Sequence, residues 1–165
     1  MTLISEAPCP CGSQNFYKEC CKAYIEENKK APTAETLMRS RYTAYVLQNS
    51  EYLLKTWYPK KRPPAIDFSK ESAEWIRLEI ISVQKGGIKD QRGLVEFQAC
   101  YRIEDKEHVM KEISRFKKER GAWFYLDGNV KSISANNGST NQGLNAPCSC
   151  GSGKKFKRCC GKKQS

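Results

Sequence analysis

The chain has 165 residues and a formal net charge of +11 at pH 7, enough for one ordinary domain with small appendages and too few for two full-sized domains. Its aromatic content of 10% and charged content of 28% are typical of a folded chain, not of a disordered one. The longest apolar run, residues 122–126, is far shorter than a bilayer span, and the first residues show no charged-then-apolar leader. We therefore expect no transmembrane segment and a cytoplasmic location.

Cysteine spacing is the strongest pattern in the chain. Eight of the nine cysteines form two copies of the spacing C-x-C-x8-C-C, and the flanking residues of the two copies also agree. They are Cys9, Cys11, Cys20, Cys21, Cys148, Cys150, Cys159 and Cys160. Such agreement indicates an internal repeat.

Four thiols within a short segment match the four tetrahedral positions of a structural metal. Zinc is the expected ion, two per chain, although an all-sulfur site also suits iron. A disulfide framework is the main alternative, but adjacent cysteines and cysteines two residues apart pair badly, and the cytosol is reducing. A narrower alternative is that one cysteine of each adjacent pair is not a ligand.

The residues around the first repeat, residues 1–28, fit a metal site. Pro8 stiffens the entry, and Gly12 can adopt the positive φ that turns backbone amides toward sulfur. Ser13 is expected to cap a short helix that presents the last two cysteines. A segment this small buries little apolar surface, so its folding should depend on the metal.

Helical patterns follow the first repeat. From Thr33, a plausible cap, apolar residues recur with the spacing of an amphipathic helix. A second helix is expected from Ser50 until Pro59 stops it, and a short one near Asp67.

The pattern then changes to an alternation of two, which predicts strands at 75–85, 94–103, 108–118 and 122–127. In the first of these, Ile76 is expected on the same face as Leu78 and Ile80. Helices followed by an antiparallel meander predict an α+β fold spanning 33–133. Residues 134–145 are uncharged and are expected to form a flexible linker.

The predicted domain contains a candidate pocket for an anionic small ligand. Its residues are Arg39, Arg41, Tyr42, Tyr45, Trp57 and Arg115. The alternative is that the arginines pair with Glu79, Glu96 or Glu112 while the aromatic residues form core. His108 is expected at a solvated edge and Cys100 as a small buried hydrophobe. The sequence contains no hydrolase, kinase or dinucleotide motif, so our first interpretation expects no catalysis.

The second repeat, in residues 146–165, is strongly basic. Residues 134–165 carry six lysine or arginine residues and no acidic one, so an anionic partner is expected at this end of the chain. Lys154, Lys157 and Arg158 stand at helical spacing on one face, beside Lys155. The first repeat has Asn15, Lys18, Glu19 and Phe16 at the matching positions.

The segment from Pro147 to Gly161 resembles the SEC-C metal-binding motif at the C-terminus of the SecA translocation ATPase, and residues 8–21 resemble it less closely. With residues 37–42, 55–57 and 114–116 between the two repeats, almost the whole chain is similar to the bacterial YchJ family. That resemblance implies a cone-like domain of the nuclear-transport-factor-two type, in which a curved sheet wraps a long helix. It also implies a partner for the basic module among the ribosome with its RNA, a secretion chaperone and anionic lipid.

Two functions follow from these patterns. The first is a metal-binding adaptor that docks on its partner through the basic second repeat. The second is a small-ligand-binding protein or enzyme that uses the pocket of the cone, with both cysteine segments structural. The oligomeric state is left open by the sequence.

Overall fold

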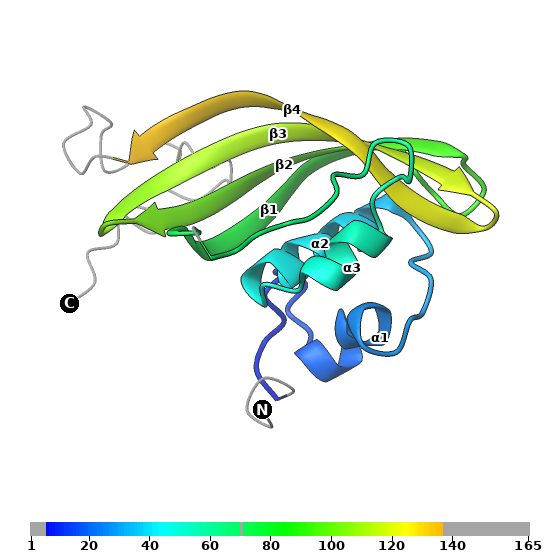
Figure 1. Ribbon diagram of the computed structural model, residues 1–165, viewed down its shortest axis with the longest axis horizontal. Coiled ribbons are helices and arrows are strands. Elements are labelled where there is room, and N and C mark those ends of the chain that lie inside the picture. Colours follow the sequence, from blue (N-terminus) through cyan, green and yellow to red (C-terminus); the bar gives the residue numbers. More distant parts are fainter. Residues whose placement is uncertain (1–5, 70, 137–165) are drawn as a thin grey trace.

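The computed structural model describes residues 6–69 and 71–136 (Figure 1). Several predictions from the sequence lie outside those ranges: Cys148, Cys150, Cys159, Cys160, Lys154, Lys155, Lys157, Arg158 and linker residues 137–145. Within the described part of the chain, no helix is long and apolar enough to cross a membrane.

Short helical elements precede the sheet. They are η1 (Tyr17–Glu19), α1 (Lys22–Ile25), α2 (Ala34–Val46) and α3 (Ser50–Lys55). The predicted cap of α2 is confirmed, because the Thr33 hydroxyl accepts a hydrogen bond of 3.1 Å from the Thr36 backbone N–H. The second helix is shorter than predicted and ends at Lys55. The described residues around Asp67 form no helix, so that prediction was wrong.

Four antiparallel strands pair in chain order to form one sheet, which confirms the predicted α+β fold. They are β1 (Glu74–Lys85), β2 (Arg92–Ile103), β3 (Lys106–Glu119) and β4 (Ala122–Asn136). The last strand is longer than predicted, because β3 keeps pairing with it, as Val109 does with Ser134. Residues 134–136, expected in the linker, therefore belong to the sheet.

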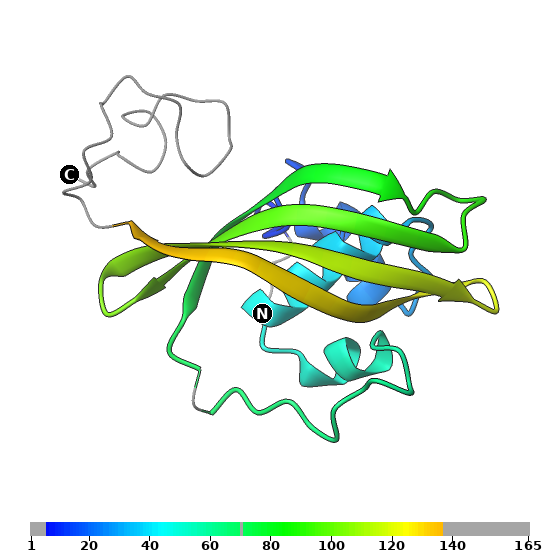
Figure 2. The same ribbon diagram turned by 90° about the horizontal axis from the view of Figure 1, so that it is seen from above.

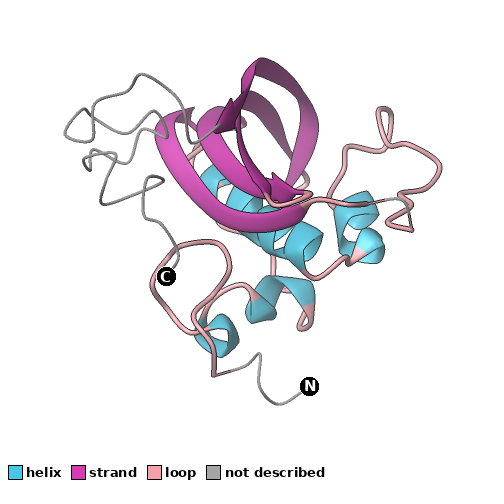
Figure 3. Ribbon diagram, turned by 90° about the vertical axis from the view of Figure 1, so that its left-hand side faces the viewer, coloured by secondary structure: helices cyan, strands magenta, loops and turns pink. Residues whose placement is uncertain are grey.

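The sheet curves around α2, as Figure 3 shows from the end of the molecule. Register shifts in β1 lie between Trp75 and Arg77 and between Ile80 and Ser82, and such bulges increase local twist. The first bulge also explains an error of prediction. Ile76 was expected on the face of Leu78 and Ile80, but it is 41% exposed while Leu78 is buried.

The interior has two parts, one on each side of α2. Between α2 and the sheet, buried side chains include Leu37, Val95, Phe97 and Phe116. The second part joins the N-terminal segment to the helices. It contains Cys9, Cys11, Tyr17, Cys21, Ile25, Ala44, Tyr52 and Leu53. Figure 1 shows this layering, with the sheet, then α2 and α3, then α1.

Two connections hold the helices against the sheet: the segment between α3 and β1, and the turn between β1 and β2. From above, the chain after α3 runs back along the sheet before β1 begins (Figure 2). At the other end, the backbones of Gly86 and Gly93 approach each other beneath the start of α2. A Cβ atom at position 93 would lie 2.6 Å from the Gly86 Cα and 3.1 Å from the Ala34 Cβ.

Replacing Gly93 with alanine should therefore destabilise the domain by about 1–3 kcal/mol, because two backbones and the first turn of α2 must separate. Chemical denaturation measures the change. Gly87→Ala is the matched control, since its new Cβ would meet only the movable Asp90 side chain, at 3.3 Å. Equal stability of the two variants would contradict the close packing described here.

Candidate functional site

The four cysteines of the first repeat form a compact cluster. The Sγ atoms of Cys9, Cys11, Cys20 and Cys21 all lie within 4.8 Å of one another. The Sγ of Cys20 lies 3.6 Å from that of Cys11 and 3.9 Å from that of Cys21. A tetrahedral zinc site with Zn–S bonds near 2.3 Å has sulfur–sulfur edges of about 3.8 Å. The thiol cluster, as we call these four residues, therefore has the size of a metal site.

A tight backbone loop brings the first pair of cysteines to the second. The Cys9 N–H donates to the Asn15 carbonyl at 2.8 Å, and the Gly12 N–H donates to the Cys9 carbonyl at 3.2 Å. Gly12 has a φ of 78°, which confirms the positive φ predicted for it. The short element η1 then leads directly into Cys20 and Cys21.

Ser13 does not cap a helix, contrary to prediction. The following helical element is a single turn that begins after Phe16, with no side-chain cap. The Ser13 hydroxyl instead accepts a hydrogen bond from the Asn15 N–H at 3.3 Å and lies 3.2 Å from the Cys20 Sγ. The Ser13 hydroxyl thus lies next to the Cys20 sulfur, where it can orient that atom for metal binding.

Helix α2 supports the thiol cluster from outside the repeat. The buried Thr43 hydroxyl donates to the Cys21 Sγ at 3.4 Å and lies 3.7 Å from the Cys9 Sγ. Arg39, expected in the pocket, instead donates from Nη1 to the Cys11 carbonyl at 2.7 Å. Its Nε also pairs with Glu35 at 3.2 Å. Sequence reasoning missed Thr43, because 22 residues separate it from its nearest sulfur partner along the chain.

Protons are unequally shared among the thiols. Hydrogen bonds from Cys21 and Cys9 lower the pKa of Cys11, despite the opposing effect of burial. Burial raises the pKa of Cys20 to about 11, and the bond to Cys11 raises that of Cys21. The cluster thus favours a thiolate at Cys11 and thiols at Cys20 and Cys21. Binding of a metal ion would displace these protons, because thiolate is the ligand form of cysteine.

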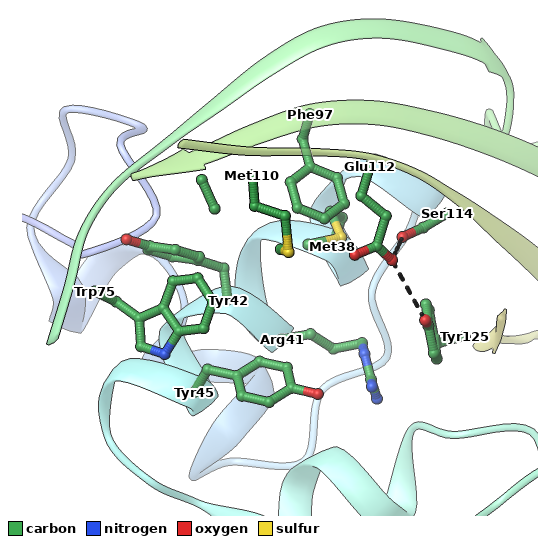
Figure 4. Close-up of a pocket in the computed structure, with 11 residues that line it drawn as sticks. Met38, Arg41, Tyr42, Tyr45, Trp75, Phe97, Met110, Glu112, Ser114 and Tyr125 are labelled. Carbon is green, nitrogen blue, oxygen red and sulfur yellow. Dashed lines mark hydrogen bonds between the residues drawn. The ribbon is translucent and has the colours of Figure 1, made fainter. Parts of the chain in front are cut away.

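A second candidate region is a cavity of about 190 Å³ between α2 and the inner face of the sheet (Figure 4). Of the residues predicted for the pocket, Arg41, Tyr42 and Tyr45 line it. Trp57 does not line the cavity. Its ring contacts that of the lining residue Tyr125 edge to face, with the ring centroids 5.1 Å apart.

Two predicted pocket residues lie elsewhere. Arg39 is at the thiol cluster, and Arg115 is exposed, where its Nε donates to Asp127 at 2.6 Å. The alternative pairings expected for the arginines also differ from those found, since the carboxylates here are Glu35 and Asp127. Glu35 lies one turn before Arg39 on α2, and Asp127 lies opposite Arg115 on β4.

The cavity also contains residues that sequence reasoning missed. Glu112 and Ser114 on β3 and Tyr125 on β4 form its polar side. A signal for the first two was present, because Met110, Glu112, Ser114 and the buried Phe116 alternate on one face of a strand.

His108 and Cys100, the histidine and the cysteine of the sheet, do not line the cavity. His108 stacks on Tyr101, with ring centroids 5.2 Å apart. Cys100 is buried, as predicted, and the Arg77 guanidinium donates to its Sγ at 3.5 Å. In the sheet register Cys100 is opposite Val109 and His108 is opposite Tyr101, and side chains at such adjacent positions point to opposite faces of the sheet.

Comparison with known proteins gives the family. The family model described as "YchJ, middle NTF2-like domain" matches residues 33–128, more than half of the chain. The chain belongs to the YchJ family. The SEC-C motif matches residues 145–162, which include the second cysteine repeat, whereas a SEC-C motif at the first repeat stays a prediction.

Relatives in the YchJ family match along nearly the whole chain. A UPF0225 protein of Photorhabdus laumondii is 44% identical over 161 residues, covering 93% of this chain and 98% of the relative. A UPF0225 protein of Vibrio vulnificus is 39% identical over 167 residues, covering 94% and 99%.

Solved structures agree. A SEC-C motif containing protein from Rhodopseudomonas palustris is 32% identical, with a TM-score of 0.68 over 76% of this chain and 100% of that one. A second, from Psychrobacter arcticus, is 33% identical, with a TM-score of 0.65 over 96% and 98%. The SEC-C match and the thiol cluster together indicate metal binding.

The hydroxyl of Thr43 gives a direct test of the support from α2. Thr43→Val keeps the shape of the side chain but removes the hydrogen bond to sulfur, so the metal affinity of the thiol cluster should fall by roughly 10–100-fold. Competition with a coloured chelator at fixed pH measures this fall, in a Cys148→Ser/Cys150→Ser background where only the first repeat can report.

Ser40→Ala is the matched control. Ser40 is buried on the same helix, but its hydroxyl bonds the Leu37 carbonyl at 2.9 Å and lies 2.7 Å from the Tyr52 hydroxyl, not from a thiol. An affinity that falls equally in both variants would assign the effect to the stability of α2 instead.

Proposed function

We propose that this protein binds a zinc ion at each of its two cysteine repeats and uses the basic second repeat to dock on an anionic partner. The observation that carries the metal proposal is the thiol cluster, in which four sulfur atoms lie within 4.8 Å of one another. The SEC-C match at residues 145–162 supports a like site in the second repeat. Iron also suits four thiolates, so the metal itself has to be measured.

The first site is proposed to be structural. Four protein sulfurs complete a tetrahedron and leave no open position for a substrate, which is the arrangement of structural zinc. Three of the four cysteines are buried against α2. At this position a metal ion would fasten the N-terminal segment to the domain, in addition to the packing of Tyr17 and Ile25 against Tyr52 and Leu53.

The second repeat is proposed to carry the docking function. Lys154, Lys157 and Arg158 share one face at helical spacing, whereas the first repeat has Asn15, Lys18 and Glu19 at the matching positions. The first repeat also contacts α2, which leaves less of its surface for a partner. We propose ribosomal RNA in the ribosome as the anionic partner, with a secretion-related protein and anionic lipid as the outcomes that the test must separate from it.

Metal content tests the first half of the proposal. Elemental analysis of protein purified in reducing buffer without added metal should give two zinc ions per chain, because each repeat supplies four thiolates. Cys9→Ser/Cys11→Ser and Cys148→Ser/Cys150→Ser should each lower the count to one. The control is Cys100→Ser, a buried cysteine outside both repeats, which should keep both ions. Less than one transition metal per chain in the unaltered protein would contradict the proposal.

Charge reversal tests the second half. Lys154→Glu/Lys157→Glu should abolish binding to ribosomes and to a single-stranded RNA probe while the metal content stays at two. For the unaltered protein, neutralising about four phosphates predicts a slope near −3 in a plot of log affinity against log salt. The matched control is Lys18→Glu, which reverses the corresponding charge of the first repeat. Affinity that follows Lys18 would refute the assignment, and binding only to anionic vesicles or to a secretion chaperone would replace RNA as the partner.

A further inference from the structure

The cavity under the sheet is polar at one end and aromatic at the other. In Figure 4, Arg41, Glu112, Ser114 and Tyr125 gather at one end, and Trp75 and Tyr42 form the other. Met38, Met110 and Phe97 lie between them and give the middle an apolar wall. Among the lining residues, Glu112, Tyr45, Trp75 and Met110 are only partly buried.

Arg41 is the central group of the polar end. It is 2% exposed, and its Nη1 donates to the Leu53 carbonyl at 2.8 Å and to the Thr56 hydroxyl at 2.7 Å. Its guanidinium carbon lies 4.5 Å from the centre of the Tyr125 ring. These partners are all neutral. Among the described residues, no carboxylate oxygen lies within the 4.0 Å of an ion pair with Arg41.

A buried cation without a carboxylate in direct contact is costly, and Glu112 interacts with Arg41 only at longer range. Removing a guanidinium from water has a large desolvation penalty that neutral hydrogen-bond acceptors and aromatic faces offset only in part. Burial accordingly lowers the pKa of Arg41. An anion in the cavity would offset this penalty, and a carboxylate matches the planar fork of donors that arginine presents.

Glu112 is fixed at the same end by its neighbours. Its Oε1 accepts hydrogen bonds from the Ser114 hydroxyl at 3.1 Å and from the Tyr125 hydroxyl at 3.5 Å. Beside it, the register shift between Lys111 and Glu112 places the extra residue on β4, the strand that pairs with Glu112 at Val130. The neighbouring strand leaves room for the carboxyl group, because a Cβ at Gly128 would lie 1.7 Å from Oε1. Glu112 is thus held at the wall of the cavity rather than turned to solvent.

The opposite end lacks hydrogen-bond partners. The Tyr42 hydroxyl and the Trp75 Nε1 are both buried, and the described part of the chain offers neither of them a partner. Their rings meet edge to face at 6.0 Å, so this end is aromatic and apolar apart from those two atoms. A flat apolar group can pack against these rings and against the methionine side chains beside them.

We propose that this cavity binds a small organic acid with a flat apolar body, its carboxylate against Arg41 and its body between the methionine and aromatic side chains. Two classes of small molecule combine a carboxylate with a flat apolar body. The ligand is either a simple aromatic acid or an apolar amino acid whose ammonium group faces Glu112. This inference goes beyond the proposed function, because every group it uses lies on α2 or the sheet and none is a cysteine.

The probe for the test is 3-phenylpropionate, titrated into full-length, metal-loaded protein. The chain has three methionines, and two of them, Met38 and Met110, line the cavity. Carbon-13 methyl spectra should therefore show saturable shifts of Met38 and Met110, while Met1 serves as an internal reference. 3-Phenylpropanol has the same body without the charge and should bind at least about tenfold more weakly, since a charged hydrogen bond is lost.

Variants locate the site. Ala99→Leu adds bulk to a lining residue that is 1% exposed, and it should abolish the shifts while the protein keeps its fold and metal content. Arg41→Lys keeps the charge but loses the planar fork, and should weaken binding at least about tenfold. The matched control is Arg115→Lys, an exposed arginine outside the cavity lining, which should bind as the unaltered protein does.

L-Phenylalanine separates the two sources. If L-phenylalanine binds more tightly than 3-phenylpropionate, the ligand is an amino acid, and Glu112→Gln should then remove the difference in affinity. If it binds more weakly, the ligand is a simple acid. No saturable shift with either probe, equal binding of 3-phenylpropanol, or unchanged binding in a folded Ala99→Leu protein would overturn the inference. Metal content measured on the same samples keeps this result separate from the proposed function.

Discussion

The architecture depends on one helix, α2, being buried on both sides while it carries polar residues. Ser40, Arg41 and Thr43 are each at most 2% exposed, so each must find a partner inside the protein. Those partners come from different segments. Ser40 meets Tyr52, Arg41 binds the end of α3, and Thr43 binds the sulfur of Cys21. Satisfying three neighbouring polar side chains therefore fixes where α3 and the cysteine segment pack.

The order of helices and strands could be read from the sequence because it rests on local patterns. The alternation in β2 and the Thr33 cap depend on neighbours a few residues away, and the cysteine spacing predicts that the four thiols of the first repeat lie close together. The structure agrees with each of these. In the candidate cavity, likewise, Arg41, Tyr42 and Tyr45 come from within about one turn of a single helix.

What could not be read depends on contacts between distant segments. Arg39 meets a carbonyl 28 residues away, and that contact takes it from the expected pocket to the cysteines. Bulges are the second source of error, because one extra residue reverses the faces of a strand and exposes Ile76. The length of β4 is the third, since pairing with β3 holds polar residues in a strand that their composition would assign to a loop.

The burial of the thiol cluster also governs how fast it can react. Cys20 is half-buried, whereas Cys9, Cys11 and Cys21 are covered by the segment's own loop and by α2. A chelator or an oxidant arriving from solvent therefore meets a single sulfur and cannot reach the others until the N-terminal segment lifts away from the helix. Release of a bound metal would then require this local opening in addition to the breaking of the metal–sulfur bonds.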